Sequence, residues 1–405
     1  MKTAMTVNAP VTSPKISILV SDLSKQGAGR WGGAVRTFLL AQALERIGAT
    51  VKIYGFVFGD EPAEATVSDV PMITVPGEYY PGFIGRSRAL LQQLDGDIIY
   101  ALRPKPTTLG LALWHKRNTG CRVILDIDDW ELSWHGGDGY RYRPRLRQLA
   151  QDILKPRGAL RYPDHPLYLR WMESRVCEAD AVTVHTQFLQ TRFGGVKIPN
   201  GKDTELFNPD AYDPQLSRQA YGLSDYRILM FPGAPRPYKG IEDVLQALDR
   251  LDDPTLRLVI VGGSPYDDYD QQLMQRWGRW IIQLPPQPVT KMPFVVAGAD
   301  IIVVPQRETP AALAQFPLKL TDGMSMAKPI LATRVGDIPE ILQDAGYLVE
   351  PEAPEAIAQQ IRWILEHFQE AQQRGALARL RCIEHYSIEA MSELLSDVVR
   401  SLQLS

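Results

Sequence analysis

The stretch FPLKLTDGMSMAKPILATRVGDIPE occupies residues 316–340 and combines one predicted strand with two predicted helix starts. Lys319 and Asp322 lie in the first short helix, and the β-branched strand 330–333 leads to a loop that holds Gly336. Helix N-termini offer free N–H groups and a positive dipole end, which suit phosphate. A carboxylate in the same place suits a ribose diol. The stretch therefore predicts a nucleotide-sugar pocket, with Lys319, Asp322 and Gly336 on the donor side.

Alternating strands and helices continue on both sides of this stretch. The apolar run 16–21 predicts a buried parallel strand, a helix that ends at Gly48 follows, and 51–54 predicts the next strand. A second series begins with the strand 227–231 and the amphipathic helix 240–251. Two successive βα series predict an α/β fold with two doubly wound parallel-sheet domains that face each other across a cleft.

The domain boundaries are predicted from changes in composition. Segment 202–225 is polar, Pro-containing and weakly periodic, and we interpret it as the linker. The first predicted domain covers residues 1–205 and carries a basic, aromatic insertion at about 136–175, while the second covers residues 206–385. Residues 386–405 hold one more predicted helix, which follows the completed second domain.

Bulk composition limits the classes of function. At 405 residues, with 45% of them apolar and 22% charged, the chain is expected to form about two globular domains. A net charge of −3 gives no overall basic field for nucleic acid. Three distant cysteines, and histidines without ligand spacing, predict neither a disulfide nor a metal site and favour a reducing cytoplasm. We expect no signal peptide and no membrane-spanning run.

A glycine-rich loop, GAGRWG at residues 27–32, matches the dinucleotide-binding pattern G-x-G-x-x-G literally. That pattern requires its first glycine directly at a strand end and an acidic residue closing the next strand, and this sequence has neither. We therefore reject dinucleotide binding. Gly32 and Gly33 instead stand at a predicted helix N-terminus, where the backbone can approach a phosphate, and the alternative is a tight turn.

A cationic turn, GAPRPYKG at residues 233–240, lies between a predicted strand and a predicted helix. Arg236 and Lys239 would stand at the mouth of a parallel sheet, where they can neutralise a diphosphate leaving group and act as catalytic residues. The alternative is a solvated surface turn. Because the turn shares a sheet edge with residues 316–340, we favour the functional interpretation.

Acidic residues cluster in DIDDWE at 126–131, at the carboxyl end of a predicted strand. Such a cluster in a cleft indicates catalysis or metal binding, whereas helix or loop capping is the alternative. Asp128 is the predicted catalytic carboxylate, and either Asp128 or Asp129 is predicted to orient the acceptor or the sugar. Arg103 and Lys105 follow the preceding strand and are predicted to point toward the same edge, the alternative being that they are solvated.

The segment 140–175 holds nine Arg or Lys residues against three acids, interleaved with tyrosines and a tryptophan. This composition predicts contact with a membrane surface or an anionic acceptor, and a solvated helical insertion is the alternative. His185 ends a predicted strand, and we interpret it as structural.

Several of these motifs together resemble the retaining GT-B glycosyltransferases of glycosyltransferase family four. The resemblance runs over nearly the whole chain and rests on WGGAVRTFLLAQALERIGATV, IPNGKDTELFNP, FPGAPRPYKGIEDVLQAL, RLVIVGG, AGADIIVVPQ and KLTDGMSMAKPILATRVGDIPEIL, in family order. It implies two Rossmann-like domains, with the sugar-nucleotide donor held mainly by the second and the acceptor by the first. It also implies a C-terminal helix that crosses back to the first domain, and a transfer that requires neither a metal nor a further cofactor.

Two positions depart from the family pattern. The Glu-x7-Glu motif of the family ends at Asp322, and its first glutamate is replaced by Ala314. The arginine that often opens the cationic turn is replaced by Ala234, and Arg236 is expected to supply the guanidinium instead. Lys319 resembles the lysine that lies by the donor phosphates in one branch of the family.

The resemblance implies a retaining transferase that moves a hexosyl unit from a UDP- or GDP-sugar to an acceptor hydroxyl, in cell-surface polysaccharide or glycolipid synthesis. The expected location is the cytoplasm, with peripheral contact at the inner membrane face. One alternative is a protein of the same fold that binds sugar nucleotides or glycans without transfer, motivated by Ala314 and Ala234. A sugar-nucleotide epimerase is the third hypothesis.

Overall fold

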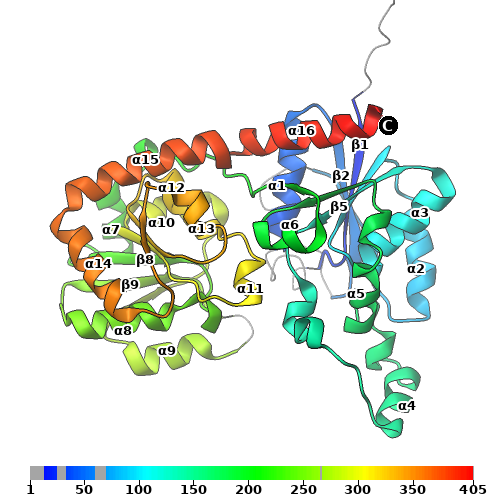
Figure 1. The fold of residues 1–405 in the computed structure, drawn as a ribbon, viewed down its shortest axis with the longest axis horizontal. Coiled ribbons are helices and arrows are strands. Elements are labelled where there is room, and N and C mark those ends of the chain that lie inside the picture. Colours follow the sequence, from blue (N-terminus) through cyan, green and yellow to red (C-terminus); the bar gives the residue numbers. More distant parts are fainter. Residues whose placement is uncertain (1–12, 25–32, 60–69, 265–266, 405) are drawn as a thin grey trace, which may run out of the picture.

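The computed structural model describes residues 13–24, 33–59, 70–264 and 267–404. It contains two parallel sheets, which lie side by side along the long axis of the molecule (Figure 1). The first sheet has the strand order β3-β2-β1-β4-β5-β6-β7, and the second has the order β10-β9-β8-β11-β12-β13. In each sheet the strand order changes direction beside the strand that comes first in the sequence, β1 or β8, as in a doubly wound fold. The prediction of two parallel-sheet α/β domains is therefore confirmed.

The first domain is built from strands β1–β7 with helices α1–α6 around them. Its strands are β1 (Lys15–Val20), β2 (Thr50–Val57), β3 (Met72–Pro76), β4 (Ile98–Leu102), β5 (Arg122–Ile127), β6 (Ala181–Val184) and β7 (Val196–Lys197). Its helices are α1 (Gly33–Arg46), α2 (Gly82–Leu91), α3 (Leu111–Thr119), α4 (Leu146–Leu154), α5 (Pro166–Glu173) and α6 (Gln187–Phe193).

The second domain contains strands β8–β13 and helices α7–α14. Its strands are β8 (Arg227–Pro232), β9 (Leu256–Val261), β10 (Ile281–Leu284), β11 (Ile301–Val304), β12 (Ile330–Thr333) and β13 (Tyr347–Val349). Its helices are α7 (Pro214–Tyr221), α8 (Ile241–Leu251), α9 (Tyr269–Trp277), α10 (Met292–Ala297), α11 (Pro310–Leu313), α12 (Leu318–Ser325), α13 (Ile338–Leu342) and α14 (Pro354–Glu366).

Continuous apolar runs form the central strands because helices cover both faces of each sheet. In β1, the side chains of Ile18 and Leu19 point to opposite faces and both are fully buried, in two separate clusters. In β8, Leu229 and Met230 show the same arrangement in the second domain. The two sheets thus each have a core on both sides, and their carboxyl-end loops remain available for a site.

The last helices link the two domains along one side of the molecule (Figure 1). Helix α15 (Phe368–Tyr386) packs on the second domain, and α16 (Ile388–Leu404) packs on α1 of the first. Ile388, Met391 and Leu395 join the first domain's core. Lys202 and Ser387 lie on the two segments that connect the domains, and they form an isolated parallel β-bridge. None of the described helices is both long and apolar enough to cross a lipid bilayer.

The segment interpreted as the linker is partly helical. The interpreted linker 202–225 contains α7, whose first turn is capped by the Asp213 carboxylate and which is flanked by the buried side chain of Leu223. A proline-led α-helix of this kind is short and weakly periodic, so its sequence resembles a loop. In the first domain, a π-helical turn, Pro106–Gly110, leads directly into α3.

Candidate functional site

The donor-side candidates gather at the carboxyl end of the second sheet. Lys319 lies in the first turn of α12, and its Cε would be 3.8 Å from a Cβ built on Gly233, which opens the cationic turn. The turn closes at Gly240, where φ is +67° and a Cβ would lie 1.8 Å from the Pro305 carbonyl oxygen. Only glycine fits that position, and it holds the turn against the end of β11. The structure therefore brings Lys239 and Lys319 together, as the sequence predicted.

Lys239 and Lys319 form what we call the open pair. The Lys239 Nζ donates to the Ala234 carbonyl oxygen at 2.9 Å, and the Lys319 Nζ lies 4.9 Å from the centroid of the Phe231 ring. Among residues that the structure describes, neither ammonium forms an ion pair with a carboxylate. The pair is thus a concentration of positive charge with no carboxylate at ion-pair distance among the described residues.

The pKa values of the open pair reflect this environment. Burial, then the nearby Lys319 ammonium and the Arg236 guanidinium, lower the pKa of Lys239 well below its usual value. Burial lowers the pKa of Lys319 to about 8, although the Asp322 carboxylate opposes the shift. A bound anion would reverse both effects, because it favours the charged form of each lysine.

Arg236 differs from the open pair in having an acidic partner. Its Nη1 lies 3.2 Å from Asp267 Oδ2, on the exposed side of the turn. Asp267 is itself half-exposed, so the ion pair is weak and can exchange for another anion. Arg236 thus stands next to the open pair, near enough to lower the pKa of Lys239.

Asp322, the predicted ribose ligand, forms an ion pair with Lys202. The Lys202 ammonium also lies 3.4 Å from the centroid of the Phe207 ring. The backbone N–H of Lys202 donates to the Tyr386 carbonyl oxygen at 2.7 Å. The sequence analysis missed Lys202 because it lies in the segment interpreted as the linker. Its place in the motif IPNGKDTELFNP was the only feature that could have indicated it.

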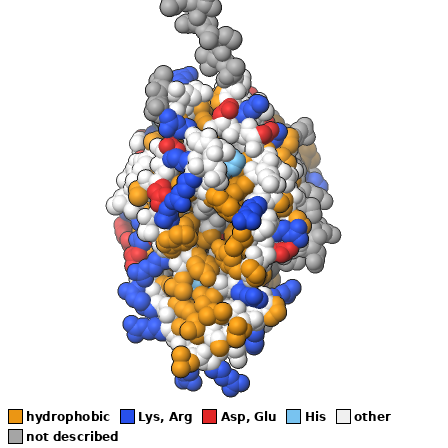
Figure 2. Space-filling model, turned by 90° about the vertical axis from the view of Figure 1, so that its right-hand side faces the viewer, with side chains coloured by type: hydrophobic (Ala, Val, Ile, Leu, Met, Phe, Trp, Pro, Cys, Tyr) orange, Lys and Arg blue, Asp and Glu red, His pale blue; other side chains and the backbone are white. Residues whose placement is uncertain are grey.

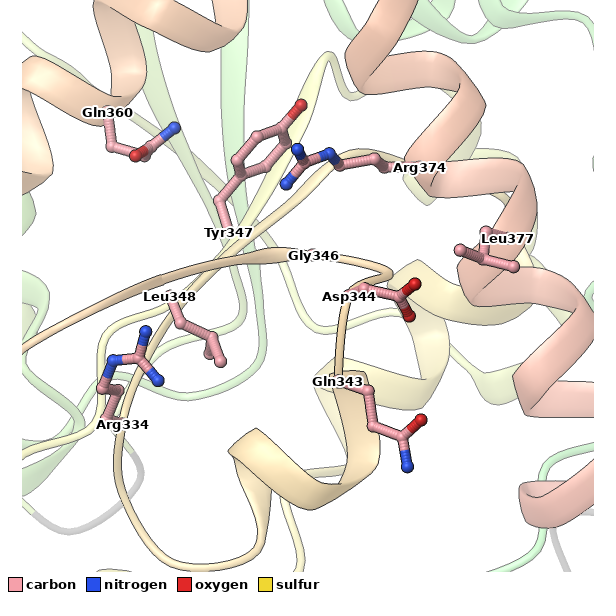
Figure 3. A pocket seen from close by; sticks show the side chains of 9 residues that line it. All are labelled: Arg334, Gln343, Asp344, Gly346, Tyr347, Leu348, Gln360, Arg374 and Leu377. Atoms are coloured by element: carbon pink, nitrogen blue, oxygen red, sulfur yellow. The ribbon is translucent and has the colours of Figure 1, made fainter.

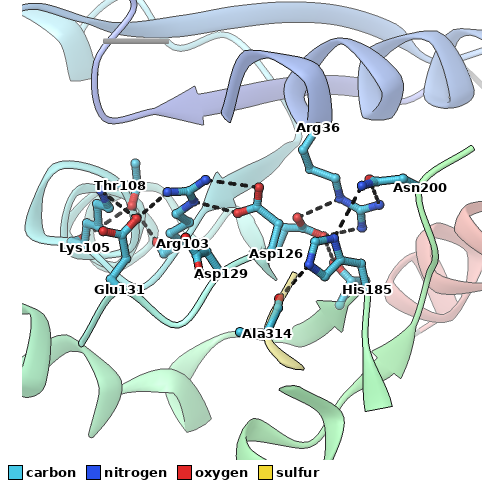
Figure 4. Close-up of polar contacts among 12 residues, drawn as sticks. Arg36, Arg103, Lys105, Thr108, Asp126, Asp129, Glu131, His185, Asn200 and Ala314 are labelled. Atoms are coloured by element: carbon cyan, nitrogen blue, oxygen red, sulfur yellow. Dashed lines mark hydrogen bonds and ion pairs between the residues drawn. The ribbon is translucent and has the colours of Figure 1, made fainter. Parts of the chain in front are cut away.

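The acceptor-side candidates lie at the carboxyl end of the first sheet and form what we call the paired cluster: Arg103, Lys105, Asp128 and Glu131. Arg103 donates to both Asp128 oxygens, at 2.6 and 3.3 Å, and forms an ion pair with Glu131 (Figure 4). The Lys105 Nζ lies 3.0 Å from Glu131 Oε1. The structure therefore places these residues at one edge as predicted, but it also shows them as ion pairs whose charges neutralise one another.

Backbone conformation directs Arg103 into the paired cluster. Its φ is +72°, in the left-handed region that costs a residue with a Cβ on the order of 1 kcal/mol. The Thr108 hydroxyl donates to its carbonyl oxygen at 2.6 Å, and its N–H donates to the Asp126 carbonyl oxygen at 2.7 Å. Burial alone would raise the pKa of Asp128, but the Arg103 guanidinium outweighs it and lowers the pKa to about 2. Asp128 is thus an ionised partner of Arg103.

Asp129 is the exception among the acids of this edge. Its Oδ2 accepts a hydrogen bond from the Trp134 indole N–H at 3.0 Å, whereas its Oδ1 has no partner among the described residues. The side chain is only 8% exposed, so the unpartnered oxygen is shielded from water. Burial raises the pKa of Asp129 to about 7, against the opposing effect of Arg103. A buried acceptor oxygen without a donor indicates a place for a ligand hydroxyl.

Trp134 connects Asp129 to the second domain. Its ring meets the Tyr238 ring edge-on, with centroids 5.9 Å apart, and Tyr238 belongs to the cationic turn. The Tyr238 hydroxyl donates to the Gln315 side-chain oxygen at 3.0 Å. The sequence analysis missed both rings, because nothing in either motif shows that they meet. The Trp134–Tyr238 contact therefore connects Asp129 to the turn that holds Lys239.

A buried network beside the paired cluster also reaches the second domain (Figure 4). Arg36 of α1 donates to both Asp126 oxygens, at 2.8 and 3.0 Å, and to Asn200 Oδ1 at 2.9 Å. His185 Nε2 lies 3.0 Å from the Ala314 carbonyl oxygen, so the ring is assigned its N–H at Nε2. Burial lowers the pKa of His185 to about 4, which keeps the ring neutral. His185 thus has a specific hydrogen-bond partner in the other domain, as expected for a structural residue.

Ala314, which replaces the first glutamate of the family motif, is fully buried at this junction. Its side chain packs with apolar residues of the first domain, in the cluster that includes Leu132 and Leu189. A carboxylate here would be enclosed by apolar side chains. The exchange of Glu for Ala is therefore accommodated by packing.

The loop around Gly336 makes a second set of contacts between the domains. Gly336 has φ +54°, and the next residue, Asp337, accepts hydrogen bonds from the Gln187 N–H at 3.1 and 3.0 Å. Lys197 of β7 lies 2.9 Å from Glu340. Gly33 is the first residue of α1, and Gly32 lies outside the described residues. The two domains thus meet at Gln187 and Lys197 as well as at Ala314.

A separate depression lies away from this site, at the edge of the second sheet beside β13 (Figure 3). It contains none of the predicted site residues. In it the Arg374 guanidinium covers the Tyr347 ring, 4.6 Å from its centroid. Elsewhere in the described chain, no group of three or more His, Cys, Asp or Glu side chains has the arrangement of a metal site.

The second domain matches a family of known enzymes. Residues 226–367, from the start of the second sheet to just past α14, match the family described as glycosyl transferases group 1. The chain is similar to the GDP-mannose-dependent alpha-(1-6)-phosphatidylinositol monomannoside mannosyltransferase of Mycolicibacterium smegmatis, with 25% identity over 238 residues, covering 55% of this chain and 62% of that protein. The chain spans 56 to 62% of the length of this protein and of two further curated relatives that it matches.

Solved glycosyltransferases share the whole fold. A glycosyltransferase from Rickettsia africae aligns over 97% of this chain and 99% of its own, with a TM-score of 0.71 and 17% identity. Anabaena Alr3699/HepE, solved in complex with UDP, aligns over 96% of this chain and 100% of its own, with a TM-score of 0.70 and 17% identity. At such identities the likeness establishes the GT-B fold, and the activity has to be argued from the site.

Proposed function

We propose that this chain is a retaining glycosyltransferase that moves a hexosyl unit from a UDP- or GDP-sugar to an acceptor hydroxyl. The observation that carries the proposal is the open pair of Lys239 and Lys319, which lies without a carboxylate partner among the described residues. Asp322, one turn along α12 from Lys319, would accept hydrogen bonds from the ribose hydroxyls. The proposed phosphate-binding residue, Lys319, and the proposed ribose-binding residue, Asp322, thus lie side by side on one helix.

The open pair would act on the leaving group. Departure of the nucleoside diphosphate leaves negative charge on the β-phosphate, and each ammonium that meets it stabilises the transition state by about 3 kcal/mol. Arg236 would join them by exchanging Asp267 for phosphate. Because these protein cations take over the charge of the diphosphate, the proposed transfer requires no metal. Amides at Gly33 and Gly336 would assist from the facing loops.

The acceptor proton has two destinations in this proposal. A phosphate oxygen of the leaving group can take it as the glycosidic bond breaks, so no protein base is required. Asp129 Oδ1 instead is the candidate acceptor for a hydroxyl of the sugar or of the acceptor, because it is buried and unpartnered. In this arrangement Arg103, Lys105 and Asp128 hold the position of Asp129 and shape the acceptor side.

Relatives support the proposal without fixing its substrates. The mannosyltransferase of M. smegmatis is named for GDP-mannose, whereas the Anabaena structure holds UDP. The proposed donor is therefore a UDP- or a GDP-sugar. A glycan or lipid-linked hydroxyl in cell-surface polysaccharide or glycolipid synthesis is the proposed acceptor class, and the cytoplasmic location stays a prediction.

Donor hydrolysis tests the proposal. The purified protein is incubated with a panel of UDP- and GDP-sugars, and release of UDP or GDP is followed over hours. We expect slow release from at least one donor and its loss in Lys239→Ala. Lys291→Ala, an exposed lysine of the same domain, is the matched control and should release nucleotide at the wild-type rate. Near-normal turnover in Lys239→Ala would contradict the assigned role.

A second candidate is a protein of the same fold that binds sugar nucleotides or glycans without transfer. Ala314 favours it, because the buried alanine removes the carboxylate that helps to place the donor sugar in relatives. Binding of a nucleotide sugar without any release over hours would favour this candidate. Product formation without any acceptor would instead favour an epimerase.

A further inference from the structure

Helix α4 (Leu146–Leu154) presents its apolar side outward, the reverse of an ordinary surface helix. Leu146 is 87% exposed and Leu154 is 75% exposed, and Ile153 between them is also exposed. Leu146, Leu149 and Ile153 are spaced three and four residues apart, so they form one continuous stripe. The single acid of the helix, Asp152, is only 5% exposed. A globular protein rarely exposes such a stripe without a use for it.

The one acid of α4 is hydrogen-bonded within the protein. Asp152 accepts hydrogen bonds from the Tyr142 hydroxyl and, at 2.8 Å, from the Gln148 side chain. The carboxylate therefore anchors α4 to the loop that precedes it. This anchoring holds the helix with its leucines facing away from the domain.

Cations without acidic partners surround the apolar stripe. Six exposed cationic side chains lie within α4 or beside its two ends, and none of them forms an ion pair within the described part of the chain: Arg141, Arg143, Arg145, Arg147, Lys155 and Arg157. Within residues 140–175, nine cations and three acids leave a net charge of +6, although the whole chain carries −3. Two of those acids, Asp152 and Asp164, are buried. The surface around α4 is thus positive and nearly free of negative charge.

The stripe and the cations lie at one end of the molecule. In Figure 1, α4 lies at the lower tip of the first domain, far from α7–α9 of the second. Figure 2 views this side directly and shows apolar side chains gathered over the lower half, with Lys and Arg side chains along the lower edges. Trp171 of α5 adds an exposed aromatic ring to the same insertion.

We propose that α4 and its flanking cations dock this protein on a bilayer surface rich in anionic lipid. Leu146, Ile153 and Leu154 would enter the boundary between headgroups and acyl chains, and the arginines would meet the phosphates. A helix with an apolar stripe, cationic flanks and a tryptophan nearby has the composition of an interfacial anchor. A second copy of this chain would bury the leucines equally well, but it would bring the same cations against one another. The charge pattern therefore selects the lipid surface.

Vesicle co-sedimentation of the full chain tests the proposal. Vesicles of equal parts phosphatidylglycerol and phosphatidylcholine are compared with vesicles of phosphatidylcholine alone. We expect binding to the anionic vesicles, which weakens as salt rises, and little binding to the neutral ones. The double variant Leu146→Gln with Leu154→Gln should lose roughly tenfold or more in affinity. The triple variant Arg143→Gln, Arg145→Gln and Arg147→Gln should lose at least about tenfold.

Matched variants on the second domain complete the test. Leu380 is 63% exposed on α15 and Arg362 is exposed on α14, so Leu380→Gln and Arg362→Gln should bind vesicles as the wild type does. Equal vesicle binding by the wild type and the leucine double variant would overturn the proposal, as would no binding to anionic vesicles. A wild-type dimer that the leucine variant dissociates, seen by light scattering, would overturn it in favour of self-association. Nucleotide release is measured on every variant, so a failure here stays separate from a failure of the proposed transferase activity.

Discussion

The paired cluster on the first sheet and the open pair on the second sheet contain similar cations in opposite electrostatic states. Arg103 and Lys105 are each within ion-pair distance of a carboxylate, whereas Lys239 and Lys319 lie near each other with none among the described residues. Paired charges fix geometry and contribute to folding, while charges of one sign held together cost stability until an anion arrives. From this difference we propose that the donor phosphate binds at the edge of the second sheet. The open pair would bind it, and the paired cluster would hold the acceptor side in shape.

Removing one cation from the open pair and one from the paired cluster should give the largest difference in kcat/KM. Lys319→Ala is expected to lower kcat/KM by about a hundredfold to a thousandfold, because one charge contact to the leaving group is lost. Lys105→Ala should cost less in kcat/KM, since Glu131 keeps its contact with Arg103. Steady-state kinetics with the active donor measures both. Equal losses in the two variants would remove the distinction between the groups.

Breaking the paired cluster should affect folding. Asp128→Asn leaves the Arg103 guanidinium with a weaker partner and is expected to lower the free energy of unfolding by about 2 to 3 kcal/mol. Asp397→Asn is the control, because its ion pair with Arg400 is exposed and should cost less than about 1 kcal/mol. Chemical denaturation of the three proteins gives both values. A stability of Asp128→Asn equal to that of the control would show that the cluster does not support the fold.

The open pair should make stability depend on pH in the alkaline range. The pKa of Lys319 is about 8 in the folded chain, below the value of about 10.4 for an unperturbed lysine. Between these values the unfolded state binds more protons, so the nucleotide-free protein should gain stability as pH rises, by at most about 1.4 kcal/mol per pH unit from Lys319. Below pH 8 this contribution is constant. Denaturation curves from pH 7 to 10 for the wild type and Lys319→Met should diverge, and parallel curves would contradict the assigned pKa.

Removing the hydrogen bond between Trp134 and Asp129 should have the smallest effect on activity. Trp134→Phe removes the N–H that donates to Asp129 Oδ2, so the pKa of Asp129 should rise further above about 7. The acid side of the activity profile is then expected to move to higher pH, with a loss of about two- to fivefold at pH 7. Trp171→Phe changes an exposed indole on the insertion and serves as control. Superimposable pH profiles for the wild type and Trp134→Phe would exclude a role for Asp129 in the measured step.

The sequence was most informative where chemistry and periodicity coincide. The strand ends of β8 and β12 could be located from apolar runs, so the cationic turn and residues 316–340 could be placed on one sheet edge before any coordinates. The resemblance to glycosyltransferases added the expectation of α16 crossing back to α1, which the packing of Ile388 and Leu395 confirms.

Other features depend on contacts between distant segments and leave no local pattern. Lys202 contacts Asp322 because the chain crosses between domains beside α15, and the segment that holds Lys202 is only weakly periodic. The left-handed φ of Arg103 does not follow from its residue type, so its pairing with Asp128 was not predictable. The outward stripe of α4 has an ordinary helical period, and the period alone does not say which side is buried.

Calorimetric titration of the full chain with UDP and with GDP tests the central claim, that the open pair is a diphosphate site. We predict that at least one of the two nucleotides binds the wild type, and that the double variant Lys239→Ala with Lys319→Ala loses at least about a hundredfold in affinity. Lys105→Ala should bind the same nucleotide as the wild type does. No binding of either nucleotide to the wild type, or equal binding to the double variant, would contradict the account.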